Sequence, residues 1–343
     1  MPELPRADLD HVLHHAEPIW PDYRGARIFV SGATGFVGSW MLESLLHARR
    51  TFAFAADVTV LVRDASAFAA RLPHLATAPG VHTQVGDVRT FDLSARTYTH
   101  FVHCASAATA QMNIEQPDAV VDLIERGTRR MVDAAGSCTG ARFLQLSSGS
   151  VYGPQPPSLP RMPESHDGAA DAQDPAQRFG ASKLIAERRA LGAAPGGVHA
   201  VAARAFAVVG PRLPLDGQFA LGNFLADARA GRPIAIHGDG TPVRSWMYAA
   251  DLAAWCWTIL ARGTAGTAYN VGSEEALSIR DAATRVAALR RPPLAVDCRR
   301  SPSADAPVSR LVPDTNRARQ AFGVDAWVPF NDAIHRTWSW LNQ

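Results

Sequence analysis

Gly32-Ala33-Thr34-Gly35-Phe36-Val37-Gly38 decides the fold of this chain, because it joins a compact apolar run to a helical pattern. The run before it, residues 26–31 (ARIFVS), reads as a buried parallel strand. Apolar residues recur at helical spacing after it, from Met41 to Leu46. In such a turn the first glycine permits the tight bend, the second lets a pyrophosphate approach the backbone, and the third lets helix pack on strand. The stretch therefore predicts a dinucleotide site at a helix N-terminus.

Strands and helices alternate beyond this turn. Further strands are expected at residues 57–62, 81–85, 98–104, 142–147 and 201–209, and helices at 117–135 and 178–191. This alternation predicts right-handed βαβ units and an α/β fold, a doubly wound parallel sheet of the Rossmann type.

Three parts of the chain are expected. Residues 1–24 read as a helical lead-in broken by Pro18 and Pro21, and residues 25–210 as the Rossmann domain, including the catalytic helix 178–191. Residues 211–343 read as a smaller, mainly substrate-binding region, part of which returns to the Rossmann core. Residues 153–174, rich in proline, serine and aspartate, predict a long surface loop.

Bulk composition narrows the function. The 343 residues are 47% hydrophobic and 19% charged, as in a soluble cored protein, and the net charge of +2 argues against a nucleic-acid partner. No signal peptide or membrane-spanning run is evident, so a cytoplasmic protein without a membrane partner is expected. Four cysteines without CxxC spacing (104, 138, 256 and 298) argue against a metal site or a disulfide framework. The single lysine, Lys183, stands among 33 arginines and suggests a specific use for a primary amine.

The end of the second expected strand should select the cofactor's ribose. An arginine there accommodates the 2′-phosphate of NADP, whereas an acidic residue binds the free 2′-hydroxyl of NAD. Arg63 favours NADP modestly, and Asp64 comes one step late for the usual NAD carboxylate. Arg63 could also stack on the adenine or point to solvent. Asp87, after the third strand, could either meet the adenine amino group or serve as a turn aspartate.

Several later motifs agree with one family. They are Ser147-Ser148-Gly149-Ser150-Val151-Tyr152-Gly153, Phe179-Gly180-Ala181-Ser182-Lys183, His103-Cys104-Ala105-Ser106, Arg204-Ala205-Phe206 with Gly210-Pro211-Arg212, Gly238-Asp239-Gly240 with Arg244, Tyr248 with Asp251, and Tyr269-Asn270-Val271-Gly272. From about Arg27 to its C-terminus the chain resembles the extended short-chain dehydrogenases/reductases, specifically the nucleotide-sugar epimerase/dehydratase group. The resemblance implies a hydride exchanged between C4 of a hexose and a nicotinamide.

The resemblance also implies site residues. The family's catalytic set is Ser/Thr, Tyr and Lys, and here Ser148 and Lys183 match the first and last. In the Tyr-x-x-x-Lys spacing both side chains share a helix face, so the ammonium can lower the pKa of the phenol and bond the ribose. The expected cofactor contacts are Gly32, Thr34, Gly35, Phe36, Val37, Gly38, Arg63, Asp87, Val88, Cys104, Ala105, Ser106 and Lys183.

The tyrosine itself is missing, because Phe179 stands in its place. Phenylalanine can neither accept nor donate a proton. Three explanations remain open: an engineered variant that traps substrate, a natural homologue with another acid/base group, or a cofactor-binding protein that has lost activity. The cofactor and substrate motifs look undecayed, which favours the first two.

Other departures narrow the reaction. The family's 4,6-dehydratases carry Asp-Glu where Gly149 and Ser150 stand, and its UDP-glucuronate decarboxylases usually keep a glutamate at the position of Ser150. C4 epimerisation, or oxidation and reduction at C4, fits better. Ala207 and Ile124 each replace a usual asparagine, which weakens any detailed transfer of substrate contacts.

The expected ligand is a nucleotide-diphosphate sugar, bound by Ser148, Asn223 and Arg244. The planar fork of an arginine suits a diphosphate. Arg244 could instead form a loop salt bridge, and Asn223 a helix cap. The tryptophans, including 246, 255 and 257, are expected in the core or an interface, and the resemblance implies a homodimer.

Three functions therefore compete. The first is a nucleotide-sugar C4 epimerase or C4 oxidoreductase, the second a catalytically silent NAD(P)-binding protein, and the third a 4,6-dehydratase with an altered acid pair. The family's chemistry stands or falls with dinucleotide binding at the glycine turn.

Overall fold

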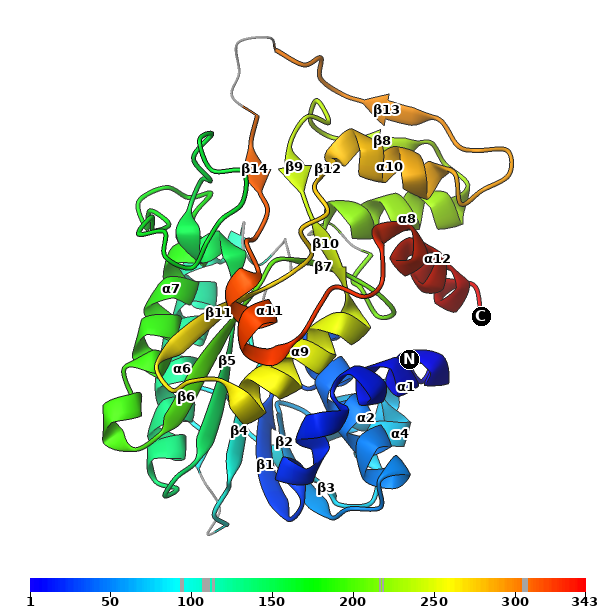
Figure 1. Ribbon diagram of the computed structural model, residues 1–343. Helices are drawn as coiled ribbons and strands as arrows, with labels where there is room; N and C mark the ends of the chain where they lie inside the picture. The colour runs from blue at the N-terminus through cyan, green and yellow to red at the C-terminus, as the bar shows by residue number, and fades with distance from the viewer. Residues whose placement is uncertain (93–95, 107–111, 113–114, 216, 218, 304–307) are drawn as a thin grey trace.

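A seven-stranded parallel sheet forms the centre of the molecule, in the order β11-β6-β5-β4-β1-β2-β3 (Figure 1). The computed structural model describes residues 1–92, 96–106, 112, 115–215, 217, 219–303 and 308–343. The strands are β1 (Ala26–Ser31), β2 (Ala56–Val62), β3 (Val81–Val85), β4 (His100–His103), β5 (Arg142–Ser148), β6 (His199–Ala205) and β11 (Thr267–Val271). The strand order reverses between β1 and β4, which confirms the expected doubly wound Rossmann topology.

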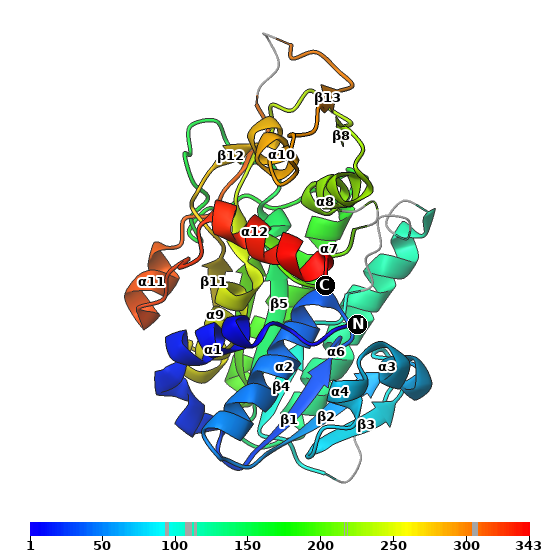
Figure 2. The same cartoon turned by 90° about the vertical axis from the view of Figure 1, so that its right-hand side faces the viewer.

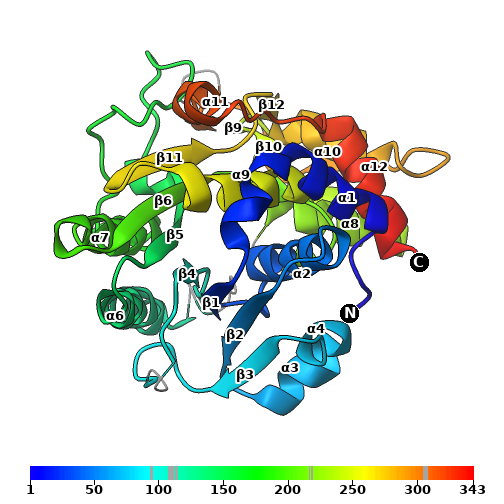
Figure 3. The ribbon, with the colours of Figure 1, turned by 60° about the horizontal axis from the view of Figure 1, so that its bottom comes forward.

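Helices cover both faces of this sheet (Figure 3). On one face Ile28 and Val30 of β1 pack in the same core as α2 (Phe36–Thr51) and α9 (Ala249–Arg262). On the other face Phe29 packs with α6 (Pro117–Gly136) and α7 (Arg178–Leu191). Burial of both faces explains why the strands read as continuous apolar runs.

The expected single strand at 201–209 is wrong, because the chain divides there at Phe206. β6 ends at Ala205, and β7 (Ala207–Val209) leaves the central sheet to pair with β10 (Trp246–Tyr248). The Phe206 amide donates to the Val271 carbonyl at 2.9 Å, and its ring packs against Gly149. Continuous hydrophobicity could not show this change of partner. The strand expected at 98–104 is also shorter, covering His100–His103 alone.

The C-terminal part alternates short elements around two small sheets, β12-β9-β14 and β13-β8, beyond the carboxyl edge of the central sheet (Figure 1). Its elements are α8 (Ala220–Ala230), β8 (Ile234–Ile236), β9 (Val243–Arg244), β12 (Leu277–Ser278), α10 (Ile279–Ala287), β13 (Val296–Cys298), β14 (Arg310–Leu311), α11 (Asn316–Phe322) and α12 (Phe330–Leu341). Residues 153–174 contain no helix or strand, as expected for a loop, apart from a bridge between Met162 and Pro313. The remaining short helices are α3 (Ala65–Arg71), α4 (Pro73–Ala76), η1 (Glu17–Tyr23), η2 (Gly149–Tyr152) and η3 (Ala194–Gly196).

Tryptophan burial agrees with the expected core role. Trp255 and Trp257 are fully buried on α9, and Trp246 is nearly so. None of the helices in the described ranges is both long and apolar enough to cross a membrane.

The N-terminal lead-in is helical and lies against the sheet domain. Helix α1 (Arg6–His15) packs beside α2 and α9 (Figure 2). Asp8 accepts hydrogen bonds from the Tyr248 hydroxyl and, at 3.0 Å, from Arg336 of α12. His11 Nε2 lies 2.6 Å from the buried carboxylate of Asp251. The lead-in therefore contacts β10, α9 and α12 together.

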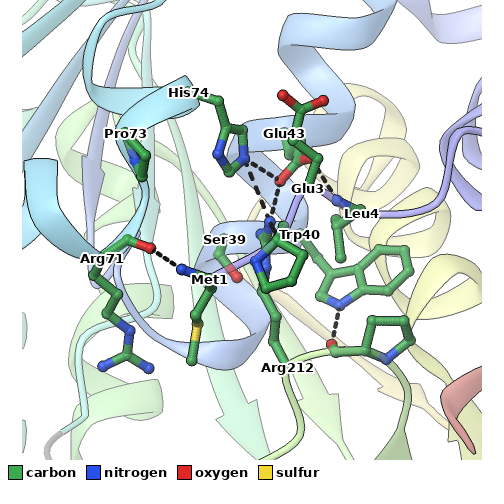
Figure 4. A network of polar contacts seen from close by, with 12 residues as sticks. Met1, Glu3, Leu4, Ser39, Trp40, Glu43, Arg71, Pro73, His74 and Arg212 are labelled. Atoms are coloured by element: carbon green, nitrogen blue, oxygen red, sulfur yellow. Dashed lines mark hydrogen bonds and ion pairs between the residues drawn. The ribbon is translucent and has the colours of Figure 1, made fainter. Parts of the chain in front are cut away.

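A second set of polar contacts fixes the first residues of the chain (Figure 4). Buried Glu43 of α2 accepts from the Leu4 amide at 2.8 Å and from Arg212 Nη2 at 2.6 Å, and it contacts His74 Nε2 at 3.1 Å. Arg212 also donates to the Pro2 carbonyl at 2.8 Å. Arg212, part of a motif quoted for the family resemblance, thus lies in a buried ion pair that joins the loop after β7 to α2.

Candidate active site

The glycine turn between β1 and α2 needs its glycines for steric reasons. Gly32 has φ +79°, and a Cβ on it would lie 2.5 Å from the Ala105 amide nitrogen. A Cβ on Gly38 would overlap the Gly32 carbonyl oxygen and lie 2.7 Å from its carbonyl carbon. Gly35 caps α2 without a side-chain hydrogen bond, and the first turn of α2 contains no acidic residue. The free amides of that turn are therefore suited to an anion.

We expect Gly38→Ala to weaken binding of a nicotinamide dinucleotide by at least about tenfold. The new methyl meets backbone atoms that cannot rotate away, so the turn must open. Fluorescence titration with NAD and NADP measures the effect. Gly136→Ala is the matched control, because a Cβ there meets nothing within 4 Å. Unchanged affinity in folded Gly38→Ala protein would show that the turn does not hold the cofactor.

A cleft opens at the carboxyl ends of β1, β2, β3 and β4, where the strand order reverses. The predicted contacts that line it are Gly32, Thr34, Gly35, Arg63, Asp87, Val88, Cys104, Ala105 and Ser106. Phe36, Val37 and Gly38 in α2 and Lys183 in α7 are not among the lining residues. The cleft is also lined by residues that were not predicted as contacts: Ser31, Leu61, Val62, Gly86 and Leu123. All except Leu123 lie in the last two residues of a strand or directly after one, and strand ends can be predicted from the sequence. Leu123 lies in α6, and no sequence motif marks it.

Two carboxylates follow the ends of β2 and β3, and both already accept hydrogen bonds. Asp64 caps α3, accepting from the Ala67 amide at 3.0 Å. Asp87 accepts from the Arg89 amide at 2.8 Å and from its guanidinium at 2.7 Å, as a turn aspartate does, and it also lines the cleft. The hydrogen bonds from Arg89 lower the pKa of Asp87 to about 2. Both carboxylates that follow β2 and β3 are thus already bonded, whereas the exposed Arg63 lines the cleft.

Lys183 is buried where α7 packs on β5. Its side chain is 3% exposed, and Nζ donates to the Leu146 carbonyl at 3.0 Å. Burial lowers the pKa of Lys183 to about 8. Cys104 lines the cleft, and burial raises the pKa of its thiol to about 12, a rise that the positive charge of Lys183 opposes. Among the residues that the structure describes, the Lys183 ammonium donates to Leu146 alone, which leaves two of its N–H groups for other acceptors.

Phe179 lies one helical turn before Lys183, with the ammonium 5.8 Å from its ring centroid. The ring is half-buried against Val120 and Ile124 of α6, so the isoleucine that replaces the family's asparagine joins the same apolar cluster. At Gly180 a Cβ would lie 2.9 Å from the Ser150 carbonyl carbon. The glycine thus lets α7 approach the end of β5, where Ser148 lies.

Three residues of the motifs quoted for the family resemblance, Tyr152, Arg204 and Asn270, form a buried hydrogen-bond network. They are not among the residues that line the cleft. The Tyr152 hydroxyl donates to Asn270 Oδ1 at 2.8 Å and accepts from Arg204 Nη1 at 2.7 Å. Arg204 in turn bonds both carboxylate oxygens of Glu187. Burial raises the pKa of Tyr152 to about 12. Tyr152 is therefore poorly suited to replace the missing catalytic phenol.

The two predicted diphosphate contacts belong to different elements of the C-terminal part. Asn223 lies inside α8, and its Oδ1 accepts from the Gly217 amide at 2.8 Å, so it does not cap that helix. Arg244 of β9 donates to the carbonyls of Val243 and Ser309, at 2.8 and 3.2 Å. These contacts are hydrogen bonds to backbone carbonyls, and not the salt bridge that was the alternative for Arg244. Within the described ranges, no three His, Cys, Asp or Glu side chains are grouped so as to hold a metal.

Fold and cleft together define a Rossmann dinucleotide-binding protein. The chain belongs to the NAD dependent epimerase/dehydratase family, whose model matches residues 28–272. This confirms the resemblance drawn from the motifs.

Individual relatives are distant and diverse. The chain is 28% identical over 265 residues to the low-salt glycan biosynthesis protein Agl12 of Haloferax volcanii, covering 73% of this chain and 78% of that protein. It is 26% identical over 320 residues to UDP-glucuronic acid decarboxylase 1 of Arabidopsis thaliana, covering 93% and 70%.

Solved structures show the same fold. An epimerase from Methanothermobacter thermautotrophicus superposes with a TM-score of 0.80 at 24% identity, covering 96% of both chains. A tyrosine-to-phenylalanine mutant of UDP-glucuronic acid 4-epimerase from Bacillus cereus, in complex with UDP-4-deoxy-4-fluoro-glucuronic acid and NAD, gives 0.78 at 21% identity, covering 92% of this chain and 99% of that one.

Proposed function

We propose that the chain acts at C4 of a nucleotide-diphosphate sugar, as an epimerase or an oxidoreductase that uses a bound nicotinamide. The observation that carries the proposal is the buried ammonium of Lys183, bound by the Leu146 carbonyl of β5 and 5.8 Å from the Phe179 ring centroid. Ser148 and Phe179 stand at the family's two other catalytic positions, at the end of β5 and the start of α7.

The residues present fit a dinucleotide. Gly32 and Gly38 leave backbone-lined space that any Cβ would fill, and the first turn of α2 offers free amides to a pyrophosphate. A bound nicotinamide supplies a hydride acceptor and donor. Lys183 would bond the ribose hydroxyls, and Ser148 would hold the sugar oxygen at C4. Phe179 gives the site an apolar wall but no proton.

Dehydration is the weaker candidate on steric grounds. A Cβ at Gly149 would lie 2.8 Å from three atoms of the Phe206 ring, so the dehydratase aspartate would require that ring to move. Ser150, at the position of the dehydratase glutamate, is a poor acid or base. These two positions support C4 chemistry over loss of water from C5 and C6.

Incubation of the purified chain with NAD or NADP and a panel of UDP- and dTDP-sugars tests the proposal. We expect either a C4 epimer with no net change in nicotinamide absorbance, or a 4-keto sugar with one reduced nicotinamide formed per sugar oxidised, detected by chromatography, mass spectrometry and absorbance. Phe179 favours one alternative, a silent dinucleotide-binding protein. Cofactor binding without sugar binding or turnover, in this chain and in Phe179→Tyr, would establish that alternative.

We further propose a preference for NADP over NAD. Arg63 is exposed at the cleft, and the nearby carboxylates of Asp64 and Asp87 are committed to other groups. We expect Arg63→Ser to weaken NADP binding by about tenfold, the scale of one charge-assisted contact, and to leave NAD binding unchanged. Calorimetric titration measures both, with the exposed Arg50→Ser as control. Equal losses for the two cofactors would contradict the preference.

A homodimer is proposed from the family resemblance, with α6 and α7 as its contact. The two helices pack side by side on one face of the sheet (Figure 3), and Ile185 of α7 is 47% exposed. Light scattering of the purified chain measures the mass.

A further inference from the structure

We propose that Ser150 is a positioning residue that makes the Ser148 hydroxyl a dedicated hydrogen-bond donor toward the sugar oxygen at C4. The inference rests on the proposed function, because it assigns a direction to the Ser148 proton in that site. Ser148 ends β5, and Ser150 follows it in the short helix η2.

Two contacts carry the inference. The Ser150 amide donates to Ser148 Oγ at 3.2 Å, as in an N-cap, and Ser150 Oγ lies 2.8 Å from the same oxygen, so the two hydroxyls share a hydrogen bond. A serine hydroxyl has one proton and two acceptor lone pairs. With the Ser150 hydroxyl as the donor of the shared bond, both lone pairs of Ser148 are used, and its own proton remains for an outside acceptor.

The backbone holds Ser150 in this position. Its carbonyl group lies directly against Gly180 of α7, where a Cβ would be 2.9 Å from the carbonyl carbon. The same close approach sets the start of α7, which contains Phe179 and Lys183. The serine pair and the helix that contains the predicted catalytic residues are therefore fixed against each other.

The two hydrogen bonds that Ser148 accepts also decide whether Ser148 can act in place of the missing tyrosine. With both lone pairs filled, Ser148 can donate a hydrogen bond to an oxygen at C4 but cannot readily take that oxygen's proton. Ser148 therefore does not replace the phenol absent at Phe179. It stabilises negative charge on the sugar oxygen, which is the role of a preorganised donor.

A binding experiment on the chain as it stands tests the direction of this proton. UDP-glucose and UDP-4-deoxyglucose are titrated by calorimetry, with NADP present, into the parent chain, Ser150→Ala, Ser148→Ala and the double variant. We expect Ser150→Ala to weaken UDP-glucose binding about 3- to 10-fold, on the scale of one hydrogen bond, and to leave the 4-deoxy sugar unaffected. The two single losses should be strongly non-additive in the double variant, because both act through one proton.

Ser150→Thr keeps the hydroxyl and should restore binding. Ser147→Ala is the matched control: this neighbour on β5 is buried, and its hydroxyl has no partner within the described ranges. In a Phe179→Tyr background Ser150→Ala should lower kcat several-fold with little change in KM for the cofactor. Additive losses, or an equal loss for the 4-deoxy sugar, would overturn the role of Ser150 while leaving the proposed function intact. Failure of the parent chain to bind any of the UDP- and dTDP-sugars of the panel would instead overturn the proposed function and this inference with it.

Discussion

Phe179→Tyr raises the turnover of a nucleotide sugar altered at C4 by about 10²–10⁴-fold, the usual contribution of general acid–base catalysis. The ring already lies one turn from Lys183, with the ammonium 5.8 Å from its centroid, so the new hydroxyl is added within the field of that charge. With a pKa of about 8, Lys183 remains mostly protonated at neutral pH. A nearby ammonium favours the phenolate, so the pKa of the new phenol should fall below its usual 10.

Steady-state product analysis measures this gain for the parent chain and the variant across the same sugar panel. Phe52→Tyr, at the C-terminal end of α2, adds the same atom far from α7 and should change nothing. The variant's rate should rise with pH as the phenol ionises and then level off. A variant that binds sugar and cofactor but gains no turnover would contradict a catalytic role for this position.

Local patterns in the sequence predicted the glycine turn and most of the residues that line the cleft. The strand, turn and helix around residues 26–46 depend on contacts within one βα unit, which glycine spacing and hydrophobic period report directly. The strand ends that line the cleft follow from parallel topology alone. Arg63 and Asp87 were found in this way.

Contacts between residues far apart in the chain could not be predicted from the sequence. Tyr152 and Arg204 were seen as family motifs, but their network depends on Glu187, from a separate helix. The division of the strand at Phe206 depends on a ring packed against Gly149, far away along the chain. Each involves partners dozens of residues apart or on a different element, which no periodicity reports.

Lys183→Met should stabilise the cofactor-free protein while weakening cofactor binding at least about tenfold. Burial lowers the pKa of Lys183 from 10.5 to about 8, so the buried charge costs the folded state about 3 kcal/mol at neutral pH. Loss of the hydrogen bond to Leu146 returns about 1 kcal/mol of that. The expected net gain is about 2 kcal/mol, or a few degrees in Tm.

The pH dependence identifies the cause. Below pH 8 the ammonium is charged in both the folded and the unfolded states, so the cost is fully present. Between pH 8 and about 10.5 the folded state releases its proton first, and the parent chain regains stability relative to the variant. Urea unfolding at pH 7, 8, 9 and 10 should therefore show the advantage of Lys183→Met shrinking. Leu184→Met, its neighbour on α7, should show no such trend. A difference in unfolding free energy that stays constant with pH would mean that packing, and not the buried charge, causes it. The buried ammonium of Lys183 would then not destabilise the cofactor-free protein, contrary to this prediction.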